Sequence, residues 1–205
     1  MNDSKLAELV RLISEWPGLM ARPDLGLVED GLVLLDHLGN ARTLVDVGTG
    51  AGLPGLPLKI ARPELQVTLI EADQAKAAFL VHACAVLNLA GVEVVARRAE
   101  DAGHDPHLRE AFDVAVARAL APMPVLVELC LPLVRVGGRL LAQKTEAEEP
   151  ARAARAIDLL GGELSGVLTA PSAARNTGTV VVIYKARPTP TRYPRRSGVP
   201  ARRPL

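Results

Sequence analysis

The sequence predicts an α/β fold in which a mostly parallel sheet of seven strands carries helices on both faces. Between residues 43 and 160, short apolar stretches without polar alternation are followed by stretches with helical periodicity. Residues 44–55, LVDVGTGAGLPG, add the end of a strand, a glycine-rich turn and the start of a helix. Strands that alternate with helices in this way indicate a parallel sheet covered by helices.

The chain before the first strand is expected to be helical. Ser4 is placed to cap a helix whose apolar residues recur at helical spacing as far as Trp16, and Pro17-Gly18 ends it. Residues 25–38 predict a second helix. We therefore divide the chain into an N-terminal helical segment (1–42), a ligand-binding domain (43–185) and a basic, proline-rich tail (186–205).

The remaining elements follow in order. Strands are expected at 43–47, 66–70, 92–96, 112–116 and 139–143, and helices at 54–61, 73–89, 122–134 and 146–160. No helix separates residues 163–168 from 179–184, so these two strands are expected to close the sheet as an antiparallel hairpin. Residues 188–205 hold five prolines and no apolar periodicity, which predicts an extended tail that is ordered only by docking.

The glycine-rich turn favours one kind of ligand. Gly48, Gly50 and Gly52 form G-x-G-x-G, with Leu53 where a dinucleotide loop has its third glycine. Asp46 precedes the turn, where a carboxylate accepts hydrogen bonds from loop amides or lies near a cationic ligand group, and repels a pyrophosphate. S-adenosylmethionine carries an ammonium and a sulfonium, so it fits better than a nicotinamide dinucleotide. The alternatives are a dehydrogenase and a glycine-rich turn without a ligand.

A second carboxylate supports a nucleoside ligand. Glu71 follows the apolar strand 66–70 and stands 25 positions after Asp46. An acidic residue near this spacing accepts hydrogen bonds from ribose hydroxyls in α/β nucleotide sites. The alternative for Glu71 is a surface residue that caps the next helix.

The composition excludes several classes of protein. No apolar run approaches the roughly 20 residues that span a bilayer, and the N-terminus shows no export signal, so a cytoplasmic location is expected. Cys84 and Cys130 have no metal-ligand spacing and are interpreted as buried free thiols. His104 and His107 are close in sequence, but we favour exposed loop positions over a metal site.

The net charge of +1 conceals an asymmetry between the body and the tail. Residues 185–205 contain seven Lys and Arg residues and no Asp or Glu. The rest of the chain has 17 cations against 23 acids, a net charge of −6. A clustered cationic tail with prolines suits the phosphates of RNA, and a solvated, disordered tail is the alternative.

Several longer stretches carry a family resemblance. They are VDVGTGAGLPGLPLKIARPELQVTLIEA, KAAFL, VVARRAED, FDVAVARALAP and RYPRRSGVPARRPL. Together they resemble the 16S rRNA guanosine-N7 methyltransferases, also called the glucose-inhibited division protein B family, over more than half of the chain. The resemblance implies a Rossmann-like class I methyltransferase fold and S-adenosylmethionine as cofactor. It also implies methyl transfer to N7 of a guanosine in 16S ribosomal RNA, as naked RNA or in a small ribosomal subunit particle.

The resemblance also assigns residues to the site. It implies a catalytic role for Arg118, whose guanidinium would pair with the cofactor carboxylate or donate to guanine O6; a structural ion pair is the alternative. N7 carries no proton, so alignment of the reactants and not a general base would dominate catalysis. The expected cofactor contacts are Asp46, Gly48, Gly50, Gly52, Leu53, Glu71, Ala99, Glu100 and Arg118. The expected RNA contacts are Arg97, Lys144, Arg192, Tyr193, Arg195, Arg196, Arg202 and Arg203.

The substrate and the assembly state leave alternatives open. The protein could instead be a related S-adenosylmethionine-dependent enzyme that methylates a small molecule or another RNA. A cofactor-binding but inactive family member is another alternative, because the segment before the first strand is shorter than is usual for the family. We expect a monomer that uses no metal ion and does not associate with a membrane.

Overall fold

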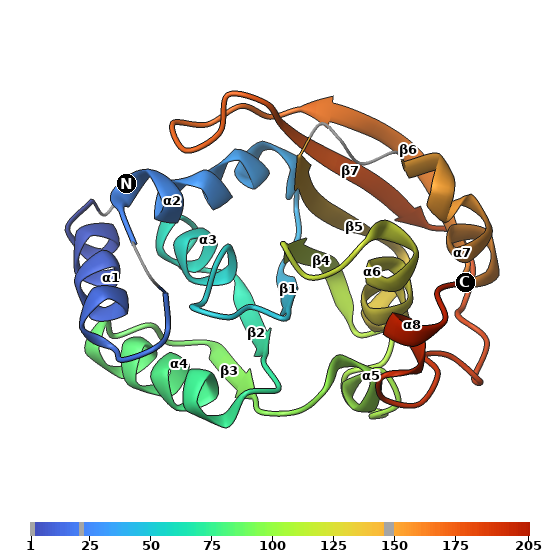
Figure 1. Ribbon diagram of the computed structural model, residues 1–205, viewed down its shortest axis with the longest axis horizontal. Coiled ribbons are helices and arrows are strands. Elements are labelled where there is room, and N and C mark those ends of the chain that lie inside the picture. The colour runs from blue at the N-terminus through green and yellow to red at the C-terminus, as the bar shows by residue number, and fades with distance from the viewer. Residues whose placement is uncertain (1–2, 21–22, 146–149) are drawn as a thin grey trace.

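The computed structural model describes residues 3–20, 23–145 and 150–205. Its centre is a seven-stranded sheet in the order β3-β2-β1-β4-β5-β7-β6 (Figure 1). β1 to β5 pair in parallel, and β7 pairs antiparallel with both β5 and β6, which confirms the predicted sheet and its terminal hairpin. The strands are β1 (Thr43–Val47), β2 (Gln66–Ile70), β3 (Val92–Val95), β4 (Phe112–Arg118), β5 (Val134–Thr145), β6 (Gly162–Thr169) and β7 (Gly178–Lys185).

Helices cover both faces of this sheet (Figure 1). The longer ones are α1 (Asp3–Glu15), α3 (Gly55–Ala61), α4 (Gln74–Val86), α6 (Met123–Cys130) and α7 (Ala154–Leu159). Shorter elements are α2 (Leu25–Glu29), η1 (Asp30–His37), α5 (Ala99–Ala102), η2 (Leu131–Leu133), η3 (Pro150–Ala153) and α8 (Val199–Arg202).

Three predicted helices differ from the observed ones. The helix expected at 25–38 is α-helical only to Glu29 and continues as the tighter 3₁₀ segment η1, with Gly31 so close to Pro54 that a Cβ would lie 2.5 Å from it. The helix expected at 122–134 changes to η2 after Cys130, because Pro132 has no amide hydrogen to continue it. Of the helix expected at 146–160, residues 146–149 lie outside the described residues, and the rest forms η3 and α7.

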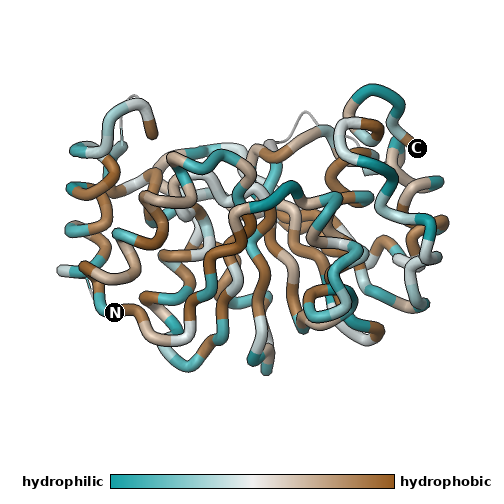
Figure 2. The backbone as a smooth tube through the Cα atoms, turned by 90° about the horizontal axis from the view of Figure 1, so that it is seen from below, coloured by the Kyte–Doolittle hydropathy of each residue, from teal (hydrophilic) through white to brown (hydrophobic). Residues whose placement is uncertain are grey.

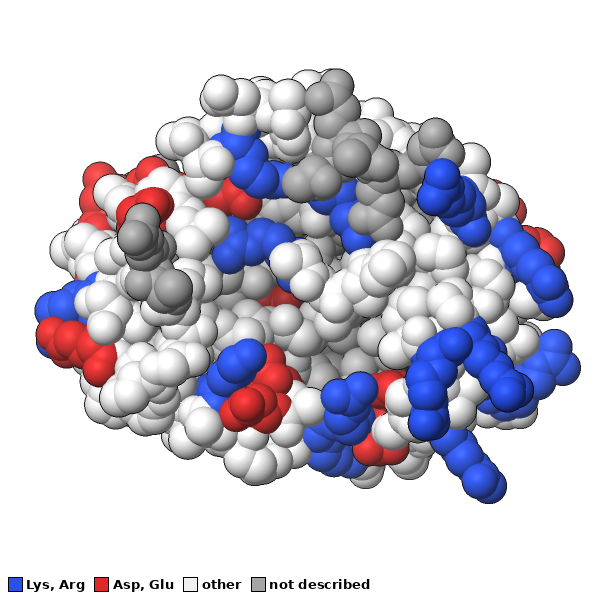
Figure 3. All heavy atoms as spheres, in the orientation of Figure 1, with Lys and Arg blue, Asp and Glu red and all other residues white. Residues whose placement is uncertain are grey.

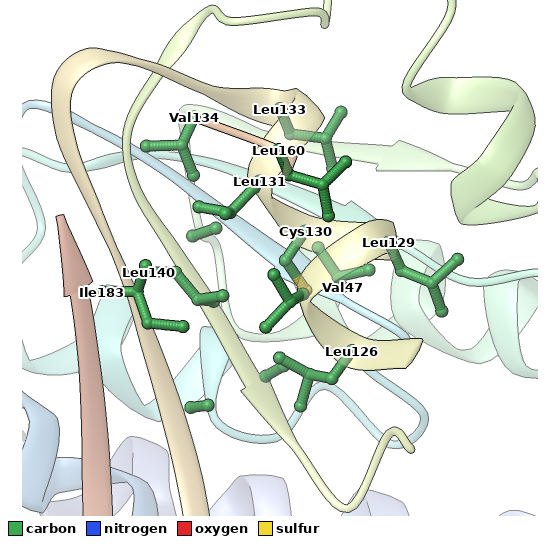
Figure 4. Close-up of a cluster of buried hydrophobic side chains, with 14 of the residues drawn as sticks. Val47, Leu126, Leu129, Cys130, Leu131, Leu133, Val134, Leu140, Leu160 and Ile183 are labelled. Carbon is green, nitrogen blue, oxygen red and sulfur yellow. The ribbon is translucent and has the colours of Figure 1, made fainter. Parts of the chain in front are cut away.

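Two apolar clusters hold the layers together. On one face, α6, α7 and the strands meet through residues such as Val47, Leu126, Leu140 and Ile183 (Figure 4). On the other face, α1, η1, α3 and α4 pack on the sheet through a second cluster. The strands are mostly brown in the interior of Figure 2, as expected of strands buried on both faces.

Residues 188–205, here called the C-terminal strap, lie on the body of the protein. In Figure 1 the strap runs past α5, and α8 lies beside α6. Arg109 donates from Nη1 to the Tyr193 carbonyl (2.8 Å) and from Nη2 to the Thr189 carbonyl (2.7 Å). Glu128, which is fully buried, accepts hydrogen bonds from the amide and the guanidinium of Arg195. The docking that the sequence left open is therefore intramolecular, and α8 interrupts the expected extended course.

Candidate functional site

The glycine-rich turn after β1 is held from beneath by Asp46. This fully buried carboxylate accepts from Thr49 Oγ1 (2.6 Å) and from the Gly55 amide (2.8 Å) through Oδ2. Burial raises the pKa of Asp46 to about 6, although the hydrogen bonds from Thr49 and Gly55 oppose the rise. Asp46 thus accepts from the loop, as predicted, and its position makes it a support of the loop.

The turn requires glycine at two of its positions for steric reasons. Gly48 has φ of +67°, and a Cβ there would lie 2.4 Å from Leu120 Cδ1. Gly52 has φ of +83°, and a Cβ there would lie 2.3 Å from Leu56 Cδ1. Gly50 also has a positive φ, and its amide donates a hydrogen bond to Glu71. Leu53 differs from the expectation of a ligand contact, because its side chain is buried in a core cluster and its amide donates to the Thr49 carbonyl.

Glu71 ties the turn to the end of β2. Its Oε2 accepts from the Gly50 amide and its Oε1 from the Asp73 amide, both at 2.9 Å. The alternative interpretation of Glu71 as a helix cap is wrong, because Asp73 caps α4 by accepting from the amides of Ala75 and Lys76. The Glu71 side chain instead lies at the wall of a hollow at the carboxyl edge of the sheet.

This first hollow has a volume of about 310 Å³ and a composition that suits a nucleoside. Polar residues of its lining include Glu71, Arg97 and Arg98, and apolar residues include Ala72, Val125 and Leu129. Apolar walls with a few polar groups are typical of small-molecule sites of this size. The carboxylate suits the two ribose hydroxyls and the apolar walls suit a base, so the residues present fit the adenosine part of S-adenosylmethionine.

Ala99 and Glu100 line this hollow, and the cofactor contact that the resemblance implies for them stays a prediction. Glu100 is almost completely buried, and its Oε1 accepts from the Gly198 amide of the strap at 2.8 Å. The same oxygen is 3.5 Å from Arg98 Nη2. Much of the bonding of this carboxylate is therefore directed to the protein itself.

A second hollow, of about 440 Å³, adjoins the first at the end of β4. Ala119, whose φ is +53°, belongs to the lining of both. The second hollow combines apolar and cationic side chains, among them Leu27, Arg118, Lys144 and Arg175. Figure 3 shows this face of the molecule hollowed near its middle, with Lys and Arg side chains around the hollow.

Asp30 holds together several side chains of the second hollow, and this role was not predicted from the sequence. The carboxylate is 1% exposed and accepts from Arg118 Nη1 (3.2 Å), Arg175 Nε (2.9 Å) and Gln143 Nε2 (3.1 Å). The Ser172 hydroxyl also donates to it. Asp30 belongs to the helix that was expected at residues 25–38, and Arg175 lies between the two expected hairpin strands, so nothing in the sequence connects them. An acidic residue within the apolar run LVEDGLVLL was the one available signal.

Arg118 occupies the predicted position at the carboxyl end of β4. Its side chain is 14% exposed, and Nη1 donates to the Leu27 carbonyl (2.9 Å) as well as to Asp30. The structural ion pair considered from the sequence is therefore present, and the same side chain also lines the second hollow. Its contact with a cofactor or a base stays a prediction.

The residues expected to bind RNA divide into two groups. The side chains of Arg192, Arg196, Arg202 and Arg203 are exposed, and Arg97 lines the first hollow while pairing with Asp105 at 2.8 Å. Lys144 is buried in the lining of the second hollow and donates to the Ala121 carbonyl at 2.6 Å.

Two strap residues lie differently from what the sequence suggested. Tyr193 is only 7% exposed, so the expectation of a ring available for stacking on bases is wrong. Arg195 forms an ion pair with the buried Glu128 at 2.6 Å, which commits its charge to holding the strap. Both residues were assigned to RNA because their type and clustering suit phosphates and bases, and the sequence does not show which side chains face inward.

In the described ranges 3–20, 23–145 and 150–205, no group of three or more His, Cys, Asp or Glu residues is arranged to hold a metal ion. In the same ranges, none of the helices has the length and apolar character that a membrane span requires. Cys130 is buried and Cys84 partly buried, and burial raises the pKa of both thiols, that of Cys84 to about 11. Both thiols therefore stay protonated at neutral pH.

Solved structures with a similar fold include two that are named as O-methyltransferases. A putative O-methyltransferase from Klebsiella pneumoniae is 16% identical with a TM-score of 0.66, and covers 91% of this chain and 92% of its own. An O-methyltransferase from Bacillus cereus in complex with SAH is 22% identical with a TM-score of 0.65, and covers 90% and 92%. The chain therefore has the fold of the class I methyltransferases.

Sequence comparison narrows this class. The profile of the family rRNA small subunit methyltransferase G matches residues 25–177. The ribosomal RNA small subunit methyltransferase G of Roseiflexus castenholzii is 53% identical over 164 residues, which is 79% of this chain and 70% of the relative. That of Moorella thermoacetica is 48% identical over 180 residues, covering 85% and 74%. The chain belongs to the rRNA small subunit methyltransferase G family, as the resemblance predicted.

Proposed function

We propose that this protein transfers a methyl group from S-adenosylmethionine to N7 of a guanosine in 16S ribosomal RNA. The observation that carries the proposal is the pair of hollows that adjoin at Ala119. One fits the adenosine of the cofactor, and the other is large and cationic enough for a nucleotide taken out of the RNA. Enzymes that modify a base must bring it out of its stack into such a pocket.

The first hollow and the glycine-rich turn would hold the cofactor. Glu71 would accept from the ribose hydroxyls with the lone pairs that remain after its bonds to Gly50 and Asp73. The backbone around Ala99 would border the adenine, and the turn above Asp46 would border the methionine part. When bound, S-adenosylmethionine would supply an electrophilic methyl carbon to the lone pair of N7, and S-adenosylhomocysteine would leave with the electrons of the broken carbon–sulfur bond.

The bonding of Asp30 supports a reaction without a general base. Four side chains donate to this carboxylate, so it is engaged as an acceptor and positions Arg118 and Arg175. Guanine N7 has no proton to lose, which matches such an arrangement. Arg118 and Arg175 would orient the guanine by donating to O6 or to a neighbouring phosphate. Alignment of N7 with the methyl group and exclusion of water then account for most of the catalysis.

An RNA substrate is favoured over a small molecule by the surface charges. Exposed arginines on the strap and on the loop after β3 stand beside the first hollow, where they suit a phosphate backbone. A small-molecule methyltransferase has no need of them. We further propose that the protein works as a monomer in the cytoplasm, where naked ribosomal RNA and small-subunit particles are both available. An inactive family member is the alternative that a turnover assay excludes.

The test is methyl transfer from labelled S-adenosylmethionine to 16S RNA transcripts and to small-subunit particles, with nucleosides identified by mass spectrometry. We expect N7-methylguanosine; label in another nucleoside, or none, contradicts the proposal. Arg118→Lys should lower the rate about tenfold or more at saturating cofactor, since an ammonium does not reproduce the planar fork. Arg62→Lys is the matched control, because Arg62 also donates to backbone carbonyls, those of Gly39 and Ala41, away from both hollows.

Glu71→Gln separates cofactor binding from chemistry. Replacing a charged acceptor by a neutral one should weaken the binding of S-adenosylmethionine by about 1–3 kcal/mol in a calorimetric titration. An unchanged dissociation constant would remove Glu71 from the cofactor site.

A further inference from the structure

The C-terminal strap forms part of the first hollow. Pro200 and Ala201, both in α8, line the same space as Glu71, Ala72 and Ala99. These residues are far apart in the sequence. The segments after the carboxyl ends of β2 and β3 provide one wall of the hollow, and α8, near the end of the chain, provides another. A ligand in this hollow is therefore in reach of the strap.

The start of α8 is fastened to α5, the helix that borders the hollow. The Gly198 amide donates to Glu100 Oε1, which lies inside the protein, and Ser197 Oγ donates to Asp101 Oδ1 at 3.2 Å. Beyond α8, Leu205 packs against the apolar cluster on the α6 face of the sheet. These contacts place α8 on the hollow, and they are separate from the anchors of the first half of the strap at Arg109 and Glu128.

The same few residues carry exposed positive charge. Arg196 precedes α8, and Arg202 and Arg203 end it, with all three side chains exposed. Figure 3 shows Lys and Arg side chains gathered over the region of α8. A phosphate bound here would contact residues within four positions of Pro200, so charge at the surface and contact with the hollow belong to one short element.

We propose that α8 couples the cofactor pocket to RNA: RNA phosphates on Arg196, Arg202 and Arg203 hold α8 against the hollow and so raise the affinity for the cofactor. This inference rests on the proposed function. A ligand that prefers the docked position of α8 shifts the strap toward it. A cofactor in the hollow would contact α8 in this docked position. Because RNA has already ordered α8, the cofactor then binds without the entropic cost of ordering it. By linkage, the cofactor raises the affinity for RNA by the same factor.

The experiment is calorimetric titration of S-adenosylhomocysteine into three proteins, each with and without 16S ribosomal RNA transcript. The first is the full chain, the second ends at Ser197, and the third is the double variant Arg196→Gln/Arg203→Gln, which keeps the hydrogen bond from Arg202 to the Gly198 carbonyl within α8. The shortened chain keeps the anchors at Arg109 and Glu128, so circular dichroism and the urea midpoint should stay close to those of the full chain. Arg11→Gln, on α1, serves as a control for the loss of positive charge away from the strap.

The expected results differ between the variants. Without RNA, the chain ending at Ser197 should bind the product about tenfold more weakly, and the double variant should bind it as the full chain does. With RNA, the full chain and Arg11→Gln should bind about fivefold or more tightly, and the double variant should lose most of this gain.

Three results would overturn the inference. They are an unchanged affinity in the shortened chain, no effect of RNA on the full chain, and a full RNA effect in the double variant. If both the loss in the shortened chain and the RNA effect in the full chain are observed, but the full chain forms no N7-methylguanosine, the coupling is supported and the proposed methyl transfer is contradicted.

Discussion

The two ends of the chain are held to the same domain by different interactions. At the N-terminus, α1 buries Leu6, Leu9 and Ile13 completely against the helices on one face of the sheet. At the C-terminus, the strap is fixed mainly by polar contacts, such as Arg109 to backbone carbonyls and Glu128 to Arg195. Burial of apolar area is non-directional, whereas the polar contacts need particular partners at particular distances. Each end should therefore respond differently to substitution.

The largest effect is expected from Leu9→Ala in α1. Removing a wholly buried leucine side chain leaves a cavity, which should lower the free energy of unfolding by about 2–5 kcal/mol. Urea denaturation measures it, and the loss should be the same at low and at high salt because no charge is involved. A loss below about 1 kcal/mol would mean that α1 contributes little to the fold.

A smaller and more local effect is expected from Arg109→Gln. The strap carbonyls of Thr189 and Tyr193 lose charged donors, which should cost about 1–3 kcal/mol. Hydrogen exchange of the strap amides and trypsin cleavage after Arg192 should accelerate, while exchange in β1 and β4 stays as it was. Faster exchange throughout the sheet would show that the strap is not a separate unit of stability.

The pH dependence of stability distinguishes the two ends further. Lys185, the last residue of β7, is completely buried and donates to the Thr189 hydroxyl of the strap, and burial lowers its pKa to about 8, although Glu110 opposes the shift. Between pH 8 and 10.5 the unfolded chain holds this proton and the folded chain does not, so stability from this group rises with pH by at most about 1.4 kcal/mol per unit. Above about pH 9 the buried thiols of Cys84 and Cys130 act in the opposite direction, because burial raises their pKa values. The measurement is therefore the difference between the urea midpoints of the wild type and of Lys185→Met, which should change with pH by this amount, also in the Leu9→Ala background. A difference that does not vary between pH 8 and 10.5 would contradict the assignment to Lys185.

The smallest effect is expected from Arg11→Gln. Arg11 pairs with Glu8 and Glu15 on the outer side of α1, where the side chains are largely in solvent. Exposed ion pairs add little, so the urea midpoint should not shift measurably. A shift as large as that of Arg109→Gln would contradict the distinction between exposed pairs on α1 and inward-facing polar contacts of the strap.

The difference between apolar burial and specific polar contacts also explains which features could be predicted from the sequence. The strand β1, the turn at Gly48 and the strand β2 could be predicted because apolar runs and glycines act over a few residues. α1 could be predicted because its buried residues recur at helical spacing. The strap could not be placed, because Arg109 and Glu128 lie far from it in the sequence and polar docking leaves no periodic pattern.

The α/β sheet, the glycine-rich turn, the place of Glu71 beside the turn and the family of the chain could all be inferred from the amino-acid sequence. Each of these depends on local chemistry: short-range steric limits on φ, apolar periodicity, or contiguous motifs. That Asp30, Gln143 and Arg175 share one hollow, and that Pro200 lines another, is known from the folded structure alone. Those contacts join residues up to 145 positions apart, and they depend on how the sheet brings its edges and both chain ends together.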